Sequence, residues 1–148
     1  MSLQGCGDGN FANFFMINCQ KCENNTYVAV NKSSCVNLSD CGDGNVGEPS
    51  RNVCMPCNFS YFAWADHLHC VPKISECDAG AIGNATSLQC MLCPSNSFAS
   101  FDHTVCLPNQ TYCGKGNYGN PTVWQCMKCP MGQISYHDYS KCVFKENC

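Results

Sequence analysis

The spacing of the cysteines is the feature that most constrains the fold of this chain. From Cys41 to Cys70 the sequence has one cysteine, twelve residues, the pair Cys54-Met55-Pro56-Cys57, twelve more residues and a closing cysteine. The same spacing occurs four times, with a period of 35 or 36 residues. A period of this length predicts an array of small units in series and not one globular domain.

Composition indicates that cysteine, and not a large apolar core, holds each unit together. The chain has 17 cysteines in 148 residues, a fraction above the level that is typical of secreted disulfide scaffolds. Large apolar residues are spread thinly, so a unit this small requires covalent crosslinks. Charged residues make up 13% and the net charge is −3, which excludes the basic face that binds nucleic acid or an anionic membrane.

The repeats divide the chain into residues 1–40, 41–76, 77–112 and 113–147, and Cys148 begins a fifth copy. Residues 1–6 align with residues 36–41, the linker that follows a closing cysteine, so Met1 has the position of an internal residue. We therefore expect the chain to be a window of a longer array, with its signal peptide and any membrane anchor outside it. The alternative is a complete protein in which Cys148 is unpaired or joined to another molecule.

Each repeat has two similar halves, and each half is predicted to form a short β-hairpin. The first half has a glycine three residues after its cysteine, where positive φ is expected; these are Gly9, Gly44, Gly80 and Gly116. The second half places a large apolar residue in a strand (Tyr27, Phe62, Phe98 and Ile134) and then a polar residue in a turn (Asn31, Asp66, Asp102 and Asp138). The predicted fold is a small, disulfide-rich array of β-hairpins and coil, elongated like a rod.

One closed loop in each half would explain why the two halves look alike. This local pairing joins Cys6 to Cys19, Cys22 to Cys35, Cys41 to Cys54, Cys57 to Cys70, Cys77 to Cys90, Cys93 to Cys106, Cys113 to Cys126 and Cys129 to Cys142. A crossed pairing, first with third and second with fourth, is chemically allowed as well, because four cysteines permit three connectivities.

Asparagine supplies the strongest local signal after cysteine. Six asparagines begin an Asn-x-Ser/Thr sequon without proline, against about two expected by chance, and are predicted N-glycosylation sites; they are Asn24, Asn31, Asn37, Asn58, Asn84 and Asn109. Asn120 is not an acceptor because Pro121 follows it. The sugars would surround a thin scaffold.

Two other chemistries that use cysteine are less consistent with the spacing. Cys54, Cys57, Cys70 and Cys77 would supply four thiolates to zinc, but structural zinc sites usually have a second tight cysteine pair. Redox catalysis requires a Cys-x-x-Cys pair at a helix N-terminus, and here turn-rich segments follow each pair. We therefore expect no metal and no cofactor other than N-linked glycans.

Histidine and tryptophan show no pattern that indicates catalysis. His67 and His103 have equivalent positions in their repeats, in what we expect to be a solvated turn. Trp64 and Trp124 are expected to be packing residues. No serine or cysteine nucleophile has a recognisable base beside it, so we expect a protein that is not an enzyme.

The segments Cys22–Cys35 and Cys93–Cys106 resemble the cysteine-rich repeats of growth-factor-receptor type. The serial Cys-x-x-Cys array is most similar to the immobilisation antigens, the surface antigens of ciliates, and more loosely to variant surface proteins of other protists. This resemblance implies a protein that is secreted, carried to the cell surface and anchored there by a C-terminal lipid.

These observations predict an extracellular structural glycoprotein of a cell-surface coat or glycosylated fibre. Its expected partners are neighbouring repeats or like molecules in head-to-tail assembly, without nucleic acid, and with a membrane contact only through an anchor outside this window. An adhesion or receptor ectodomain is the alternative, with aromatic clusters at Phe59–Trp64 or Phe11–Phe15 as its binding surface. A zinc-binding thiol protein is the third reading.

Overall fold

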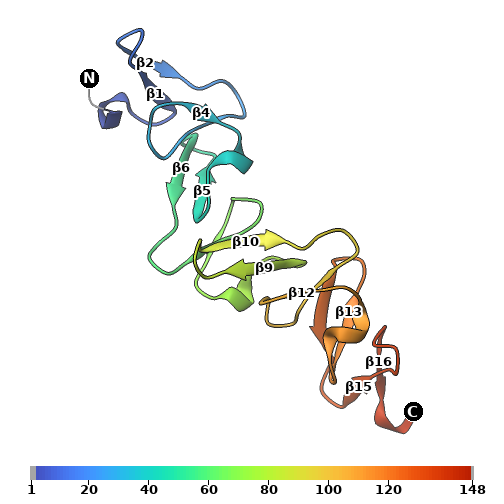
Figure 1. The fold of residues 1–148 in the computed structure, drawn as a ribbon. Coiled ribbons are helices and arrows are strands. Elements are labelled where there is room, and N and C mark those ends of the chain that lie inside the picture. The colour runs from blue at the N-terminus through green and yellow to red at the C-terminus, as the bar shows by residue number, and fades with distance from the viewer. Residues whose placement is uncertain (1–2, 148) are drawn as a thin grey trace. The chain divides into compact units, whose positions relative to one another are not determined.

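The structure is a computed structural model that describes residues 3–147, and in this range it consists of short strands, 3-10 segments and coil without an α-helix (Figure 1). The strands are β1 (Asn10–Asn13), β2 (Asn18–Lys21), β3 (Tyr27–Val28), β4 (Cys35–Val36), β5 (Asn45–Glu48), β6 (Val53–Pro56), β7 (Phe62–Ala63), β8 (Cys70–Val71), β9 (Ala81–Asn84), β10 (Gln89–Leu92), β11 (Phe98–Ala99), β12 (Cys106–Leu107), β13 (Asn117–Asn120), β14 (Gln125–Lys128), β15 (Gln133–Ser135) and β16 (Cys142–Phe144). The 3-10 segments are η1 (Leu3–Cys6), η2 (Leu38–Asp40), η3 (Ile74–Glu76), η4 (Gln110–Cys113) and η5 (Lys145–Asn147).

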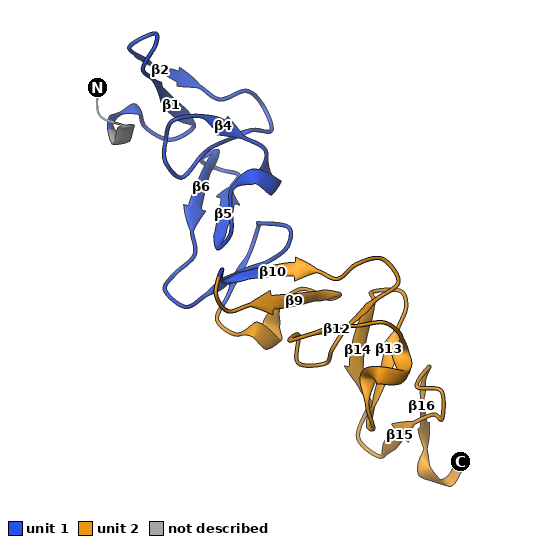
Figure 2. Cartoon of the chain, viewed as in Figure 1, with its two compact units in different colours: residues 1–71, 87–89 blue, residues 72–86, 90–148 orange. Residues whose placement is uncertain are grey.

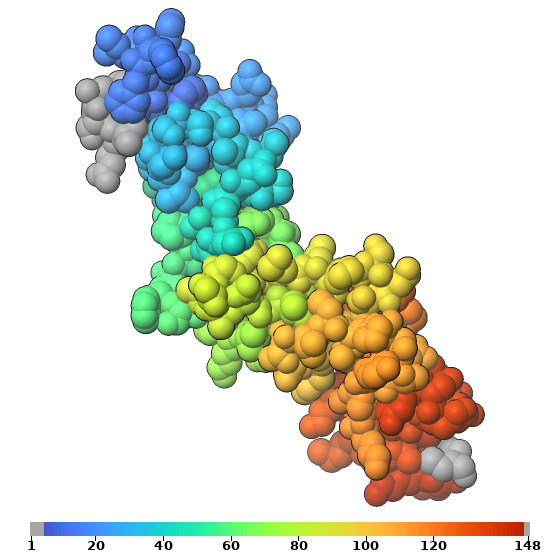
Figure 3. Space-filling view, viewed as in Figure 1, coloured from blue at the N-terminus to red at the C-terminus, as the bar shows by residue number. Residues whose placement is uncertain are grey.

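The described chain divides into two compact units, which are treated separately below (Figure 2). Unit 1 comprises the residues up to 71 together with 87–89, and unit 2 comprises 72–86 and the residues from 90 onward. Within each unit the surface changes colour in sequence order, as Figure 3 shows. Packing therefore joins segments that are neighbours along the chain, which is typical of repeat proteins.

Each half of a repeat contributes a hairpin. The first-half hairpins β1–β2, β5–β6 and β13–β14 are antiparallel with four paired residues on each strand. The second-half hairpins β3–β4, β7–β8, β11–β12 and β15–β16 are shorter. Since these are the hairpins predicted for the two halves, the disulfide-rich β-hairpin fold class is confirmed.

The hairpins of successive repeats join into mixed sheets. In unit 1 the strand order is β4-β3-β6-β5, and in unit 2 it is β12-β11-β14-β13. One parallel register position, Val28 opposite Val53 or Ala99 opposite Gln125, connects the two hairpins of each sheet. The second half of one repeat and the first half of the next thus share a sheet, and we call this connection a joint.

The cores at the joints are small and contain sulfur. In unit 1, Val28 and Val53 are buried with Cys22, and Phe11 and Cys35 pack against them. In unit 2, Phe98 is buried with Cys113 and Cys126, and Leu107 packs against them. Disulfides thus act as core residues as well as crosslinks.

The 3-10 linkers pack on a glycine of the following hairpin. A Cβ atom added at Gly47 would meet the Leu38 side chain, and one added at Gly119 would lie 2.5 Å from Gln110 Cβ. Gly83 has the same position and faces Ile74. The absence of a side chain at these positions makes room for the linker.

Candidate functional site

The eight disulfides make up the covalent part of the candidate site. They join the cysteines of the local pairing: Cys6–Cys19, Cys22–Cys35, Cys41–Cys54, Cys57–Cys70, Cys77–Cys90, Cys93–Cys106, Cys113–Cys126 and Cys129–Cys142. Each bond closes a loop with a sequence separation of 13. The Cα–Cα distances of 5.3–5.7 Å fit disulfide geometry. Cys148, predicted to be unpaired or joined to another repeat, lies outside the described residues.

The cysteine sulfur atoms that a zinc site would need are bonded in disulfides. Zinc binds deprotonated thiolate sulfur. Cys54, Cys57, Cys70 and Cys77 each belong to a disulfide instead. Within residues 3–147, no group of three or more His, Cys, Asp or Glu side chains is arranged to hold a metal ion.

A backbone hydrogen bond repeats at every joint. The Val28 N–H donates to the Asn52 carbonyl at 2.8 Å, and the Ala63 N–H donates to the Leu88 carbonyl at 3.0 Å. In unit 2 the Ala99 N–H donates to the Trp124 carbonyl at 2.9 Å. The accepting residues all have positive φ, at +51°, +55° and +54° respectively. This conformation turns the carbonyl of a first-half hairpin toward the preceding repeat.

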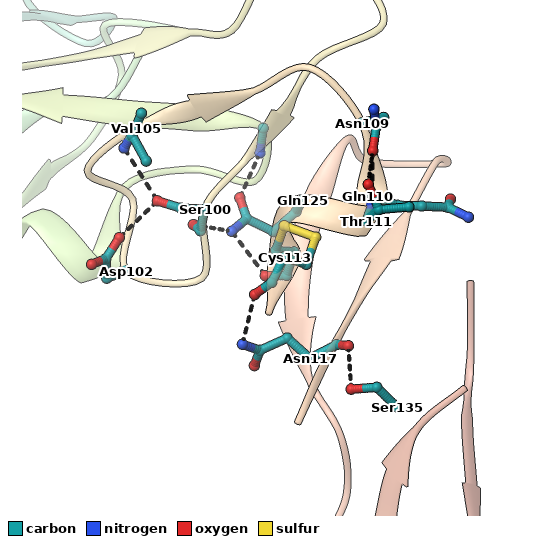
Figure 4. The surroundings of a disulfide bond; sticks show 12 residues. Ser100, Asp102, Val105, Asn109, Gln110, Thr111, Cys113, Asn117, Gln125 and Ser135 are labelled. Carbon is teal, nitrogen blue, oxygen red and sulfur yellow. Dashed lines mark hydrogen bonds between the residues drawn. A yellow bond between two sulfur atoms is a disulfide. The ribbon is translucent and has the colours of Figure 1, made fainter. Parts of the chain in front are cut away.

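A glutamine directly after the accepting residue adds side-chain bonds at two joints. Gln125 is buried, its Oε1 accepts from the Gly80 N–H at 2.9 Å, and its Nε2 donates to the Ser100 carbonyl at 2.9 Å. Figure 4 shows Gln125 beside the Cys113 disulfide, with its amide between these backbone groups. Gln89 makes the equivalent bonds in unit 1, to Gly44 and Trp64.

Sequence reasoning missed these glutamines. A signal exists in the sequence, because glutamine precedes the second cysteine in the third and fourth repeats. At the first joint Val53 takes this position and is buried against Val28 instead. This position can therefore hold either a glutamine that hydrogen-bonds across the joint or an apolar residue that packs against the preceding repeat.

Side chains differ from joint to joint around this common backbone frame. The Trp124 ring lies 5.1 Å from the Phe98 ring, so the prediction that Trp124 is a packing residue is confirmed.

At the first joint Arg51 forms a bidentate ion pair with Asp8, at 2.8 and 2.9 Å. This hydrogen-bonded guanidinium lowers the pKa of Asp8 below its ordinary value. Both side chains are about half exposed, so water and salt screen the pair.

The expectation of a solvated turn at His67 and His103 is wrong. Both side chains are buried, with 9% and 8% exposed. Nδ1 of His67 lies 2.9 Å from the Asn45 carbonyl, and Nδ1 of His103 lies 2.8 Å from the Ala81 carbonyl. The rings therefore tie the second-half turn to the first-half hairpin of the same repeat, a structural role that explains why both repeats have histidine there.

The polar residues predicted to lie in turns do so, and their side chains also cap those turns. Oδ1 of Asp102 accepts from the backbone and hydroxyl groups of Thr104, and from the Ser100 hydroxyl. These donors lower the pKa of Asp102, with the Thr104 hydroxyl as the largest cause. Asn31, Asp66 and Asp138 accept from residues two positions further along in the same way. An Asx turn thus closes each second-half hairpin.

All predicted glycosylation sites lie at the surface. The six sequon asparagines are exposed: Asn24, Asn31, Asn37, Asn58, Asn84 and Asn109. Four belong to unit 1, and Asn84 and Asn109 belong to unit 2. They lie in turns, directly before η2 and η4, or at the end of β9. Exposure in such segments is what attachment of a glycan requires.

The structure indicates an oxidising environment, such as that of secreted proteins, because eight disulfides occur in a small chain. None of its helical segments within residues 3–147 has the length and apolarity needed to cross a membrane.

No protein-family model matches the chain, and no curated protein matches it either. The geometry supports a cysteine-rich repeat protein of consecutive disulfides and β-hairpins.

Proposed function

We propose that this chain is an extracellular structural glycoprotein, part of a cell-surface coat or fibre of the kind to which the immobilisation antigens belong. The observation that carries the proposal is the combination of six exposed sequons with a closed disulfide in every half-repeat. Disulfides restrict the unfolded chain, by about 3 kcal/mol for a loop of roughly 15 residues on the entropic model. The glycans hydrate the surface and block proteases, while the crosslinks keep the backbone extended and stiff. Attachment to a cell would come through a lipid anchor outside these residues.

A non-enzymatic role fits the chemistry of the described surface. Within the described residues, the groups with displaced pKa values are Arg51 and carboxylates that bond to turn residues or to Arg51, such as Asp138 beside Ser140. The buried histidines bond to backbone carbonyls. These groups stabilise turns, and the repeats carry them as structural elements.

An adhesion or receptor ectodomain is the second candidate, favoured by exposed aromatic side chains. Phe59 is 96% exposed and Phe15 is fully exposed. Phe59, however, is the middle residue of the sequon that begins at Asn58, so a glycan would stand beside it. Of the two aromatic clusters named in the sequence analysis, the Phe11–Phe15 segment is therefore the better candidate for such a role.

The test is the intact mass of unreduced protein that is secreted from eukaryotic cells, with free thiols blocked, before and after removal of N-glycans. We expect glycan mass that disappears in steps when the six asparagines are changed singly to Gln, and at most one blocked thiol. Asn120→Gln is the matched control, because Pro121 prevents glycosylation at Asn120. Many blocked thiols, bound metal released on acidification and no sugar would overturn the proposal and favour zinc.

The protective role has its own measurement. The glycosylated protein should resist proteolysis longer than the deglycosylated protein, and reduction should remove most of the remaining resistance. Equal digestion rates in all three states would contradict a coat function, even if every sequon carried sugar.

A further inference from the structure

We propose that the two Asp-Gly bonds of the chain, Asp8–Gly9 and Asp43–Gly44, are sites of spontaneous isoaspartate formation, and that one contact of the adjacent joint restrains the reaction at each of them. The modification loosens the joint at which it occurs. This inference goes beyond the proposed function, because it depends on no glycan and on no partner molecule.

Both Asp-Gly bonds lie at the centre of a β-turn that directly precedes a strand, β1 or β5. The turns are closed by the N–H groups of Asn10 and Asn45, which donate to the carbonyl of the residue before the aspartate at 3.4 and 3.2 Å. Both aspartates are exposed, and both glycines have a φ of +75°. The third and fourth repeats have Ala79 and Lys115 in place of the aspartate, so only the first two repeats contain this bond.

The reaction requires the glycine nitrogen and the aspartate carboxyl group to meet. The nitrogen attacks Cγ of the aspartate, an N–C bond forms, and the amide proton leaves with the carboxyl hydroxyl group as water, which gives a five-membered succinimide. Water then adds at the backbone carbonyl and opens the ring, so the chain continues through the aspartate side chain and the composition is unchanged. Glycine favours this attack because it has no Cβ to hinder the approach.

At the second site the joint restrains the glycine nitrogen. Oε1 of Gln89 accepts a hydrogen bond from the Gly44 N–H at 3.0 Å, and Gln89 is 3% exposed. Within residues 3–147, the Asp43 carboxylate has no hydrogen bond or ion pair. The N–H that must give up its proton is therefore held in the joint, whereas the carboxylate is not held.

At the first site the joint restrains the carboxylate instead. Val53 has the position of Gln89, and no group of the described residues accepts from the Gly9 N–H. Both carboxylate oxygens of Asp8 accept from Arg51, at 2.8 and 2.9 Å. These hydrogen bonds fix the orientation of the carboxylate and lower the pKa of Asp8, which keeps it ionised. An ionised carboxylate reacts slowly, since water leaves readily only from the protonated acid.

An isoaspartate lengthens the backbone by one carbon atom at a place where the joint has little room. A Cβ atom at Gly44 would lie 3.2 Å from the Ser87 carbonyl oxygen, and one at Gly9 would lie 3.5 Å from that of Arg51. The Gly44 carbonyl also accepts from the Cys57 N–H at 2.9 Å. A longer chain at this turn displaces these groups together, so the modification weakens the joint.

The test is peptide mass spectrometry of the whole protein after storage for several weeks at neutral pH with its disulfides intact, with isoaspartate counted at each site. In the unchanged protein both sites should react more slowly than in the reduced, unfolded chain. Gln89→Leu should raise the rate at Asp43 about two- to ten-fold, as the loss of one hydrogen bond implies, and leave Asp8 unchanged. Arg51→Gln should raise the rate at Asp8 about two- to five-fold and leave Asp43 unchanged.

Each variant is the matched control for the other, because all of these residues belong to unit 1. A rise at both sites in one variant would show general loosening of the unit, and a rise at neither site would show that the contacts do not restrain the reaction. Either result would overturn the inference, as would equal rates in the folded and the unfolded chain.

Hydrogen exchange of the stored protein tests the effect on the joint. Molecules with isoaspartate at Asp43 should lose protection of the Ala63 amide, which bonds to the Leu88 carbonyl, and keep that of the Val28 amide at the first joint. Equal protection of Ala63 in modified and unmodified molecules would refute the loosening. These results leave the proposed function standing or falling by itself, since glycan content and protease resistance are measured separately.

Discussion

The side-chain amide of Gln125 accepts a hydrogen bond of 2.9 Å from the backbone N–H of Gly80, 45 residues earlier in the chain. Gln125 belongs to the first half of the fourth repeat and Gly80 to that of the third, so one buried side chain connects two repeats. The same amide bonds to the Ser100 carbonyl. A buried amide with both of its functions paired fixes the register of the joint, since a shifted register would leave polar groups without partners.

Replacing Gln125 by Leu should lower the local stability of this joint by about 1–3 kcal/mol, because the Gly80 N–H stays buried without its acceptor. Hydrogen exchange of the Gly80 and Ala99 amides measures this change directly. Asn18→Leu is the control, since Asn18 has the same position in the first repeat but is exposed. Unchanged protection of Gly80 in the Gln125 variant would contradict the assigned role.

Removing the Cys113–Cys126 disulfide by a double change to Ala should destabilise the β13–β14 hairpin by about 3 kcal/mol. The reason is twofold: the unfolded loop is released, and two buried core residues lose volume. Exchange protection should fall in the third and fourth repeats. In the matched Cys6/Cys19 double variant the loss should be confined to the β1–β2 hairpin, because Cys19 is exposed and neither cysteine belongs to the core formed by Cys22, Val28 and Val53. A chain-wide loss in either variant would show that the repeats do not unfold separately.

Gly119→Ala should cost about 1–3 kcal/mol by overpacking, since the new Cβ would lie 2.5 Å from Gln110 Cβ and 3.2 Å from its backbone Cα. Gly47→Ala should cost less, because the atom in its way is the end of the flexible Leu38 side chain. Urea-dependent hydrogen exchange of the two hairpins would rank the variants. The opposite order would mean that the linker backbone moves more easily than the leucine side chain.

The Asp8–Arg51 ion pair should give a pH dependence to the first joint. Because the pair lowers the pKa of Asp8, its contribution is present above the ordinary aspartate pKa and is lost as the pH falls through the lower, folded value. The carboxyl carbon shift of Asp8, followed by NMR, should therefore titrate below the usual range. Arg51→Gln should return the midpoint to that range, whereas Lys32→Gln should move it less, because the charge of Lys32 affects the pKa of Asp8 less than Arg51 does. If the titration midpoint of Asp8 were the same in the Arg51→Gln variant, the ion pair would not form in solution.

Local features of the fold were predictable because they depend on residues close in sequence. The similarity of the two halves of each repeat predicted the hairpins, the glycines at Gly44 and Gly80 have the expected positive φ, and Asp102 caps its turn. The joints were not predictable, because their common bond uses backbone groups. The accepting residues Asn52, Leu88 and Trp124 share a conformation and no side-chain chemistry.

The histidines show a second limit of sequence reasoning. A polar residue in a turn-like segment is usually solvated, so His67 was expected at the surface. Its burial depends on the first-half hairpin of the same repeat, whose Asn45 carbonyl faces the ring. This contact joins segments 22 residues apart, and neither segment alone indicates it.

Each disulfide closes within one half-repeat, whereas each sheet extends from one repeat into the next. Because these two boundaries do not coincide, whole repeats can be gained or lost during evolution of the coding sequence. A duplication or deletion of one period keeps every cysteine with its partner and presents the same carbonyl to the same amide at the new boundary. Unequal recombination can therefore lengthen or shorten the coding sequence by whole repeats while every disulfide and the backbone hydrogen bond of each joint are retained, and only the side chains at the new boundary meet in a new combination.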